Sequence, residues 1–478
     1  MEISKLNSNE HKRDLWEYVD SDEYQLHVTI STIGSTIESE EIDDKIVYME
    51  DLEKRKQVYG ICGECNEPGT GQDWCQPCNA KRFKDNFKNW TSGNKDIDEF
   101  IQQSQLNAVY FKKYLEWIPF ENFKDITYIT RGGFGKIYSA EWPEGYLEYW
   151  DIENQKWKRF SIKVALKSLD NSSCISTEFL NEIKTHLQIY LWDVIQCYGI
   201  TQDPNTKDYM MVLKYCKDGN LRNYYLNNES DYYLKSRKLQ LIARGLLDIH
   251  NAGKIHKDFH SGNILFNSAP YISDLGMCQP ANNEKQSVKQ EGIYGVLPYM
   301  APEVLRGYQY TKASDIYSFG IIMNEYISEE TPYNNIPHNH ALAINICKGL
   351  RPNIFKYTPQ LLANLITKCW DAKAENRPTA KELYQELDKL YYVDYKYTSQ
   401  VDEYYDKIKL NRTSEKKSNN IQIHPQAIYT SRLLNFKNLP EPVNSDVTKT
   451  TLHSECFDCQ LDELDFNEIN QEEENSIE

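Results

Sequence analysis

The chain has 478 residues, of which 40% are hydrophobic and 26% are charged, so it can form a packed core and has room for about two to four domains. The formal net charge of −17 lies at the two ends, because residues 1–55 carry −9, residues 391–478 carry −8 and the stretch between them is neutral. This balance excludes a chain built mainly to neutralise nucleic-acid phosphates.

Residues 1–55 are polar, acidic and weakly periodic, and we predict a disordered extension there. The start of the chain contains no apolar stretch of the signal-peptide type. No run of about 18–20 apolar residues occurs, so we predict no membrane span. We therefore expect a cytoplasmic location, with the nucleus as the alternative, where the 12 cysteines stay reduced.

The short module at residues 56–80 contains the sequence CGECNEPGTGQDWCQPC. Two C-x2-C pairs on tight turns can present four thiolates to one ion in a tetrahedron, which suits Zn²⁺. We predict a structural zinc site formed by Cys62, Cys65, Cys75 and Cys78. The alternatives are free thiols or two disulfides, and a reducing compartment disfavours the disulfides. Four cysteine ligands leave no open position, which disfavours a catalytic zinc.

Residues 81–124 are predicted to be a helical linker, because Phe83, Phe87 and Trp90 recur at helical spacing. The run NAKRFKDNFKNW also interleaves basic and aromatic residues, as a patch for nucleic acid or an acidic partner does. We favour a helix with one packed aromatic face and one solvated basic face.

The central part, residues 125–391, begins with short β-type runs such as KIYSAEW and IKVALKSL and continues with helical patterns such as RKLQLIARGLLDIHNAG. This is an α+β order. The segment GYLEYWDIENQKWKRF is predicted to be a long hairpin loop between two early strands. Residues 392–478 lose the pattern, and we predict an acidic, largely disordered tail.

A glycine-rich turn, YITRGGFGKIYSAEW, opens the central part. Gly132, Gly133 and Gly135 allow backbone N–H groups to approach phosphates, although a plain hairpin turn would explain the glycines equally well. The sequence VALK then ends a strand at Lys167, and TEFLNEIKTHLQI places Glu182 on a helix, where its carboxylate can hold that lysine in place.

Further motifs follow in order along the chain. The sequence GKIHKDFHSGNIL places Asp258 and Asn263 five residues apart, ISDLGM contains Asp274, and YMAPEVL and ENRP contain Glu303 and Arg377. Together with the earlier motifs, this order and spacing resemble the protein kinase family over more than half of the chain. The sequences YGVLPYMAPEV and WDAKAENRPT are most similar to the tyrosine-kinase-like serine/threonine group.

The resemblance implies a bilobal protein kinase fold of the α+β class, with a small β-rich N-lobe and a larger α-helical C-lobe. The zinc-binding module precedes it, and the acidic extensions flank it. The resemblance also implies a Mg²⁺- and ATP-dependent protein kinase of intracellular signalling, which transfers the γ-phosphate of ATP to protein hydroxyls. Serine and threonine are the favoured acceptors.

The catalytic roles follow from the same resemblance. Lys167 is expected to bind the α- and β-phosphates, with Glu182 as its ion-pair partner. Asp258 is expected to accept the substrate hydroxyl proton, and Asn263 and Asp274 are expected to bind Mg²⁺. The residues expected to contact ATP are Ile129, Gly132, Gly133, Gly135, Ile137, Ala165, Lys167, Leu213, Lys214, Cys216 and Leu265. Glu303 and Arg377 are expected to form a buried structural ion pair.

Some positions depart from the family pattern: Thr130, Lys257, His260, Leu275 and Val296. Lys257 can neutralise a phosphate but lacks the bidentate fork of arginine, and His260 and Val296 bear on the preferred hydroxyl. None of the departures removes the base, a metal ligand or the ATP lysine. We therefore favour an active kinase over the alternative, a catalytically weak kinase-fold scaffold that acts through its zinc module and tails.

The partners expected from this interpretation are ATP and protein substrates. The zinc module and the acidic tails are the surfaces at which we expect further protein partners. Phosphorylation of Ser287 or Tyr294, between the Asp274 and Glu303 motifs, is a hypothesis for activation.

Overall fold

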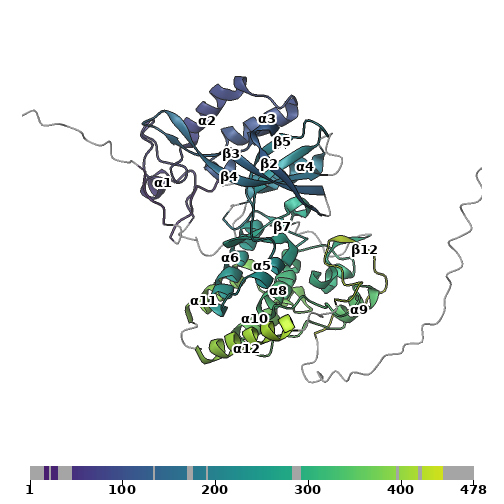
Figure 1. Cartoon of the computed structure of the whole chain (residues 1–478). Helices are drawn as coiled ribbons and strands as arrows, with labels where there is room; N and C mark the ends of the chain where they lie inside the picture. The colour runs from purple at the N-terminus through teal and green to yellow at the C-terminus, as the bar shows by residue number, and fades with distance from the viewer. Residues whose placement is uncertain are drawn as a thin grey trace, which may run out of the picture.

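The computed structural model describes residues 16–20, 23–30, 46–132, 135–169, 176–189, 192–281, 292–393, 398–417 and 423–444. They form two lobes, one built around a β-sheet and one built from helices (Figure 1). The predicted bilobal α+β fold is confirmed. None of the described helices is long and apolar enough to cross a membrane.

The first lobe contains a six-stranded sheet in the order β1-β5-β6-β4-β3-β2, antiparallel except for the pair β1–β5. Its strands are β1 (Glu116–Trp117), β2 (Lys124–Gly132), β3 (Gly135–Asp151), β4 (Lys156–Leu169), β5 (Cys197–Gln202) and β6 (Tyr209–Lys214). Side chains alternate between the faces, so Val164, Leu166 and Val212 lie in a buried cluster on one face. Lys167 therefore projects from the opposite face, opposite Met211.

Strands β3 and β4 continue to pair far beyond the body of the sheet. The segment GYLEYWDIENQKWKRF, predicted to be a loop, is mostly paired strand, with Trp150 opposite Trp157. The chain reverses at residues 152–155, where the Asn154 N–H donates to the Asp151 carboxylate (3.0 Å). The loop prediction was wrong. The polar residues of this segment are typical of a loop, but pairs of aromatic side chains across the two strands stabilise a β-ribbon.

Parts of the predicted N-terminal extension pack against the cysteine-rich module. The buried apolar residues that it contributes are Val19, Leu26, Val28 and Val47. They share one cluster with the fully buried Trp74. The prediction of a disordered extension over residues 1–55 therefore does not hold for residues 16–20, 23–30 and 46–50. The average composition of this stretch is acidic, but its few apolar side chains are enough to pack against the module.

Helices α1 (Leu52–Tyr59), α2 (Gln76–Asn86) and α3 (Lys95–Leu106) lie beside the sheet (Figure 1). Helix α2 starts inside the predicted module 56–80, so the predicted boundary with the linker 81–124 falls within one helix. Helix α3 packs Ile97 and Ile101 against Ile183 of helix α4 (Thr177–Gln188). The linker thus covers the helix that carries Glu182.

The second lobe is built around helix α8, which is buried from Ser314 to Ser328. Its helices are α5 (Leu221–Asn227), α6 (Tyr232–Asn251), α7 (Pro302–Leu305), α8 (Lys312–Ser328), α9 (His340–Cys347), α10 (Gln360–Cys369) and α11 (Ala380–Val393). Short strands are β7 (Lys254–Ile255), β8 (Ile264–Asn267), β9 (Ala269–Ile272), β10 (Gln279–Pro280) and β11 (Ile293–Gly295). Single 3-10 turns occupy Phe87–Asn89, Phe111–Lys113, Phe120–Asn122, Ser261–Asn263, Leu275–Met277, Leu297–Tyr299 and Ala374–Asn376.

Two parts of the predicted disordered tail are packed on the second lobe. Helix α12 (Thr398–Lys417) buries Val401, Tyr404 and Ile408. The Tyr404 hydroxyl donates to the Ile327 carbonyl of α8 (2.7 Å). Residues 423–444 contain strand β12 (Arg432–Leu434), which pairs with β11. The tail prediction fails for these parts because their apolar residues lack a clear period outside the context of the lobe.

Candidate active site

A buried lysine joins two carboxylates between the lobes. Lys167 lies near the end of β4, and its Nζ lies 2.8 Å from Glu182 Oε1 on α4 and 2.8 Å from Asp274 Oδ1. Burial by itself would lower the pKa of Lys167, but the two carboxylates raise it well above its usual value. The lysine is therefore charged at neutral pH, as a phosphate ligand must be.

Asp274 is held in an unusual backbone conformation two residues after strand β9. Its φ of 60° lies in the left-handed region, and the next residue, Leu275, is buried in the helical lobe. Gly276 allows α4 to approach, because a Cβ there would lie 3.0 Å from Glu182 Oε2. Burial would raise the pKa of Asp274, but Lys167 holds it below its usual value.

The loop that carries Asp258 is fixed from below by helix α8. The carboxylate of Asp315 accepts backbone hydrogen bonds from His256 (2.8 Å) and Lys257 (3.1 Å). Lys257 has a φ of 69°, a strained conformation that these hydrogen bonds stabilise. The side-chain amide of Asn263 donates to the backbone carbonyl of Asp258 (2.9 Å) and to its Oδ2 (3.3 Å). Asp258 and Asn263 are thereby brought together.

The same loop is joined to the strand that precedes Asp274. The Ser273 N–H and hydroxyl both donate to the Asn263 carbonyl, at 2.8 and 2.9 Å. Ser273, the neighbour of Asp274, therefore links the two groups, so that contacts connect all five predicted catalytic residues. The oxygen atoms of Asn263 and Asp274 are the donors that Mg²⁺ prefers, so the residues present fit this ion.

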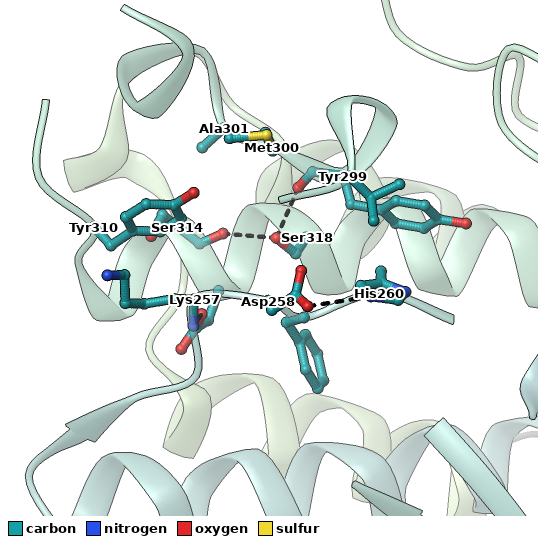
Figure 2. Close-up of a pocket in the computed structure, with 12 residues that line it drawn as sticks. Lys257, Asp258, His260, Tyr299, Met300, Ala301, Tyr310, Ser314 and Ser318 are labelled. Atoms are coloured by element: carbon teal, nitrogen blue, oxygen red, sulfur yellow. Dashed lines mark hydrogen bonds and ion pairs between the residues drawn. The ribbon is translucent and has the colours of Figure 1, made fainter. Parts of the chain in front are cut away.

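His260 completes the surroundings of Asp258. Its Nδ1 accepts from the Gly262 N–H (3.1 Å), which assigns the proton of the neutral ring to Nε2, and this Nε2 lies 3.6 Å from Asp258 Oδ2. Figure 2 shows Asp258 between Lys257 and His260, below Ser318 and Tyr299. Burial would raise the pKa of Asp258, but neighbouring His260 and Ser431 hold it below its usual value.

The predicted ATP-contacting residues of the sheet share one face. Ile137 lies opposite Lys167, and Ala165 lies opposite Leu213, so these side chains project from the face of the sheet that carries the lysine. Leu265 lies on β8 in the second lobe and forms a β-bridge with Asn220.

The remaining residues predicted to contact ATP lie in the β2–β3 hairpin, at the end of β6 and in the connection between the lobes. Gly132 and Gly135 form the last pair of the β2–β3 hairpin, and Gly133 lies outside the described residues. Ile129 is 46% exposed beside a register shift of that hairpin. The Lys214 N–H donates to the Gln196 carbonyl (3.0 Å), so Lys214 can offer adenine only its carbonyl. Cys216 follows in the connection between the lobes, half-buried.

The four predicted zinc ligands come together at one point of the first lobe. All four sulfur atoms lie within 4.8 Å of one another, with Cys62 3.9 Å from Cys78 and Cys65 3.6 Å from Cys75. Tetrahedral zinc with bonds of about 2.3 Å separates its sulfurs by about 3.8 Å. The described cysteines are free thiols, so this cluster could hold a metal ion.

The basic and aromatic run after this cluster is engaged within the chain. Arg82 forms an ion pair with Glu64, and its guanidinium lies 4.2 Å from the Trp150 ring centre. Phe83 is buried and stacks on Trp157 at 5.2 Å. These contacts support the interpretation of the run as a packed helix rather than as a patch that binds nucleic acid.

Two further observations bear on the predictions for the second lobe. Arg377 donates to both carboxylate oxygens of Glu303 (2.7 and 2.8 Å), which confirms the predicted structural ion pair. Ser287 lies outside the described residues, whereas the Tyr294 hydroxyl donates to the Ser431 carbonyl (3.2 Å). Ser431 was not predicted, because it stands beside Thr430 in a polar tail without any local motif.

Fold and site together define a phosphotransferase of the two-lobed kinase type. A family model described as protein tyrosine and serine/threonine kinase matches residues 123–387, which is more than half of the chain. The chain therefore belongs to the protein kinase family.

Curated relatives resemble this chain at modest identity. Tyrosine-protein kinase SPK-1 of Girardia tigrina is 24% identical over 282 residues, which cover 56% of this chain and 53% of that protein. Serine/threonine-protein kinase VIK of Arabidopsis thaliana is 28% identical over 280 residues (56% and 60%). Dual specificity protein kinase shkA of Dictyostelium discoideum is 27% identical over 267 residues (54% and 47%). The chain thus spans about half the length of these relatives.

Proposed function

We propose that this chain is a Mg²⁺- and ATP-dependent protein kinase that phosphorylates serine and threonine hydroxyls in the cytoplasm. The observation that carries the proposal is the connected set of contacts that joins Lys167, Glu182 and Asp274 to Asp258 and Asn263. Membership of the kinase family supports it, as does the similarity to the Arabidopsis serine/threonine-protein kinase.

The residues divide the work of phosphoryl transfer, which needs positioning and charge neutralisation more than covalent chemistry. Lys167 binds phosphate oxygens of ATP, and Glu182 orients the lysine. Asp258 accepts the proton of the attacking hydroxyl. Bound Mg²⁺ supplies positive charge at the phosphates, and Asn263 and Asp274 are the residues that hold it. His260 presents its Nε2–H beside the base and orients the acceptor hydroxyl.

The cysteine cluster is proposed to bind one structural zinc ion. The sulfur spacing supports zinc, and four thiolate ligands leave no position for a reaction. Zinc would fix the start of α2, which supplies Phe83 to the aromatic contact with the β3–β4 hairpin. The metal would therefore stabilise the packing of α2 against the β3–β4 hairpin.

The test is transfer of radiolabelled phosphate from ATP to a set of synthetic peptides that carry serine, threonine or tyrosine. The full chain is expected to label serine and threonine peptides. The variant Asp258→Ala is expected to lower the rate at least about 100-fold, because general-base catalysis contributes about that much. Rates equal to those of the variant would refute the kinase proposal and leave a kinase-fold scaffold.

A further inference from the structure

The second lobe carries a segment of its own chain against the catalytic base. Residues 423–444 have no regular secondary structure apart from the strand β12, which lies beside the helical lobe (Figure 1). Strand β12 pairs antiparallel with β11, so that Arg432 lies opposite Gly295 and Leu434 opposite Ile293. An extended peptide that adds a strand to an exposed edge is a common mode of peptide recognition.

This pairing places one hydroxyl at the base. The Ser431 Oγ lies 2.7 Å from Asp258 Oδ1 and 2.6 Å from Asp258 Oδ2, and the His260 Nε2 lies 3.3 Å from the same Oγ. A general base must lie within about 2.6–3.2 Å of the group whose proton it takes. Ser431 meets that requirement, whereas the neighbouring Thr430 is exposed.

Contacts on both sides of Ser431 hold the segment in this register. Before it, the Tyr429 hydroxyl donates to the Pro332 carbonyl (2.8 Å), and the Tyr429 ring lies 4.4 Å from the Arg222 guanidinium. After it, Arg432 donates to the His338 carbonyl (2.7 Å).

The anchoring continues farther along the segment. Leu434 is buried in the core of the lobe. The Val443 N–H donates to the Cys347 carbonyl (2.9 Å). The hydroxyl therefore reaches the base through an interface of many contacts and not through one flexible side chain.

We propose that Ser431 is the phosphoacceptor of an intramolecular reaction, in which the chain phosphorylates its own docked segment; this rests on the proposed kinase function. The Ser431 Oγ forms a bond to the γ-phosphorus of ATP, while the bond from that phosphorus to the β–γ bridging oxygen breaks. The hydroxyl proton passes to the Asp258 carboxylate, and ADP leaves with the electron pair of the broken bond.

The same geometry sets the class of hydroxyl. The backbone of the segment at Ser431 lies so close to Asp258 that a hydroxyl carried on Cβ reaches the carboxylate. A tyrosine hydroxyl stands several ångströms farther from its backbone and would not fit in this register. Segment 423–444 thus acts as a built-in serine substrate.

Phosphorylation also changes the segment's affinity for the site. A phosphoserine carries about −1.5 to −2 charges at neutral pH and would stand against the Asp258 carboxylate. Like charges repel, so the modified segment leaves and the site opens for other proteins. Until then the segment competes with external peptides at the high effective concentration of a tethered ligand.

The test uses the full chain, treated with a phosphatase that is then removed, and MgATP. Phosphate on each residue is followed by mass spectrometry over about a hundredfold range of protein concentration. Ser431 is expected to be modified with a rate constant independent of concentration, in the wild type and in the matched control Thr430→Ala. An apparent first-order rate constant that rises in proportion to protein concentration would overturn the intramolecular reaction.

Transfer to a synthetic serine peptide is measured in the same samples. Peptide labelling without modification of Ser431 would overturn this proposal and leave the kinase function standing. Absence of transfer to either would overturn both.

A second variant tests the docking. Leu434→Asp places a charge in a buried position and is expected to slow modification of Ser431 at least about tenfold while lowering the KM for the external peptide. An unchanged Ser431 rate in that variant would show that docking of β12 does not deliver the hydroxyl.

Discussion

The contact between Glu182 and Lys167 allows a quantitative test of the site. Both side chains are buried, with 4% and 8% exposure, and their atoms lie 2.8 Å apart. Glu182→Gln preserves the size of the side chain but removes its charge. Lys167 would then keep only Asp274 as a charged partner, and Asp274 is also the proposed ligand of the metal.

A hydrogen bond between charged groups contributes about 1.5–3 kcal/mol. Its loss corresponds to about 10- to 100-fold in a rate or equilibrium constant. We therefore expect Glu182→Gln to lower kcat/KM for ATP by that factor. The assay is steady-state peptide phosphorylation at varied ATP concentration, with thermal unfolding measured on the same samples.

The matched control is Lys184→Gln, an exposed position on the same helix. The kcat/KM of this variant for ATP is expected to stay within about twofold of the wild-type value, because the charge of an exposed lysine contributes little to stability or to the site. If Glu182→Gln remained within that margin as well, with an unchanged Tm, the inference that Glu182 orients the phosphate-binding lysine would be refuted.

Three other perturbations test the metal site, the C-lobe and the pH dependence. Cys75→Ser is expected to abolish the bound zinc, measured as one ion per wild-type chain by elemental mass spectrometry, and to lower the Tm; a wild type without metal would contradict the site. Arg377→Ala is expected to lower the free energy of unfolding in urea by about 3–5 kcal/mol, since it leaves Glu303 unpaired, and a loss below about 1 kcal/mol would contradict a buried pair. Burial lowers the pKa of His186 to about 4, so the unfolded chain binds more protons between pH 6.5 and 4 and stability falls as the pH falls through that window. His186→Leu is expected to remove about 3 kcal/mol of that loss, and identical pH profiles would exclude a neutral buried histidine.

The parts of the site that the sequence predicted are those that short motifs specify. Lys167, Asp258 and Asp274 each stand in a local pattern whose strand or turn presents the side chain in a defined direction. Once the family order of such motifs is recognised, their meeting in space follows, and the contacts of Lys167 agree with it.

Features that depend on distant contacts were not predicted. Ser431 meets Asp258 across 173 positions of sequence, and nothing local distinguishes its hydroxyl from that of Thr430. The buried Val28 and Val47 stand in an acidic segment whose average composition predicts solvation. Likewise, only the sheet register shows that the Lys214 N–H is already bonded.

The long β3–β4 hairpin has a practical consequence for work on this protein. Leu147 and Trp157 belong to the same apolar cluster as Trp74 and Tyr114, which precede the kinase region matched by the family model. A fragment cut at residue 125 would expose one side of the hairpin as an aromatic patch, a surface that promotes self-association. Expression, crystallisation and binding studies are therefore best begun at about residue 16 or earlier, because Val19, Leu26 and Val28 belong to the same cluster.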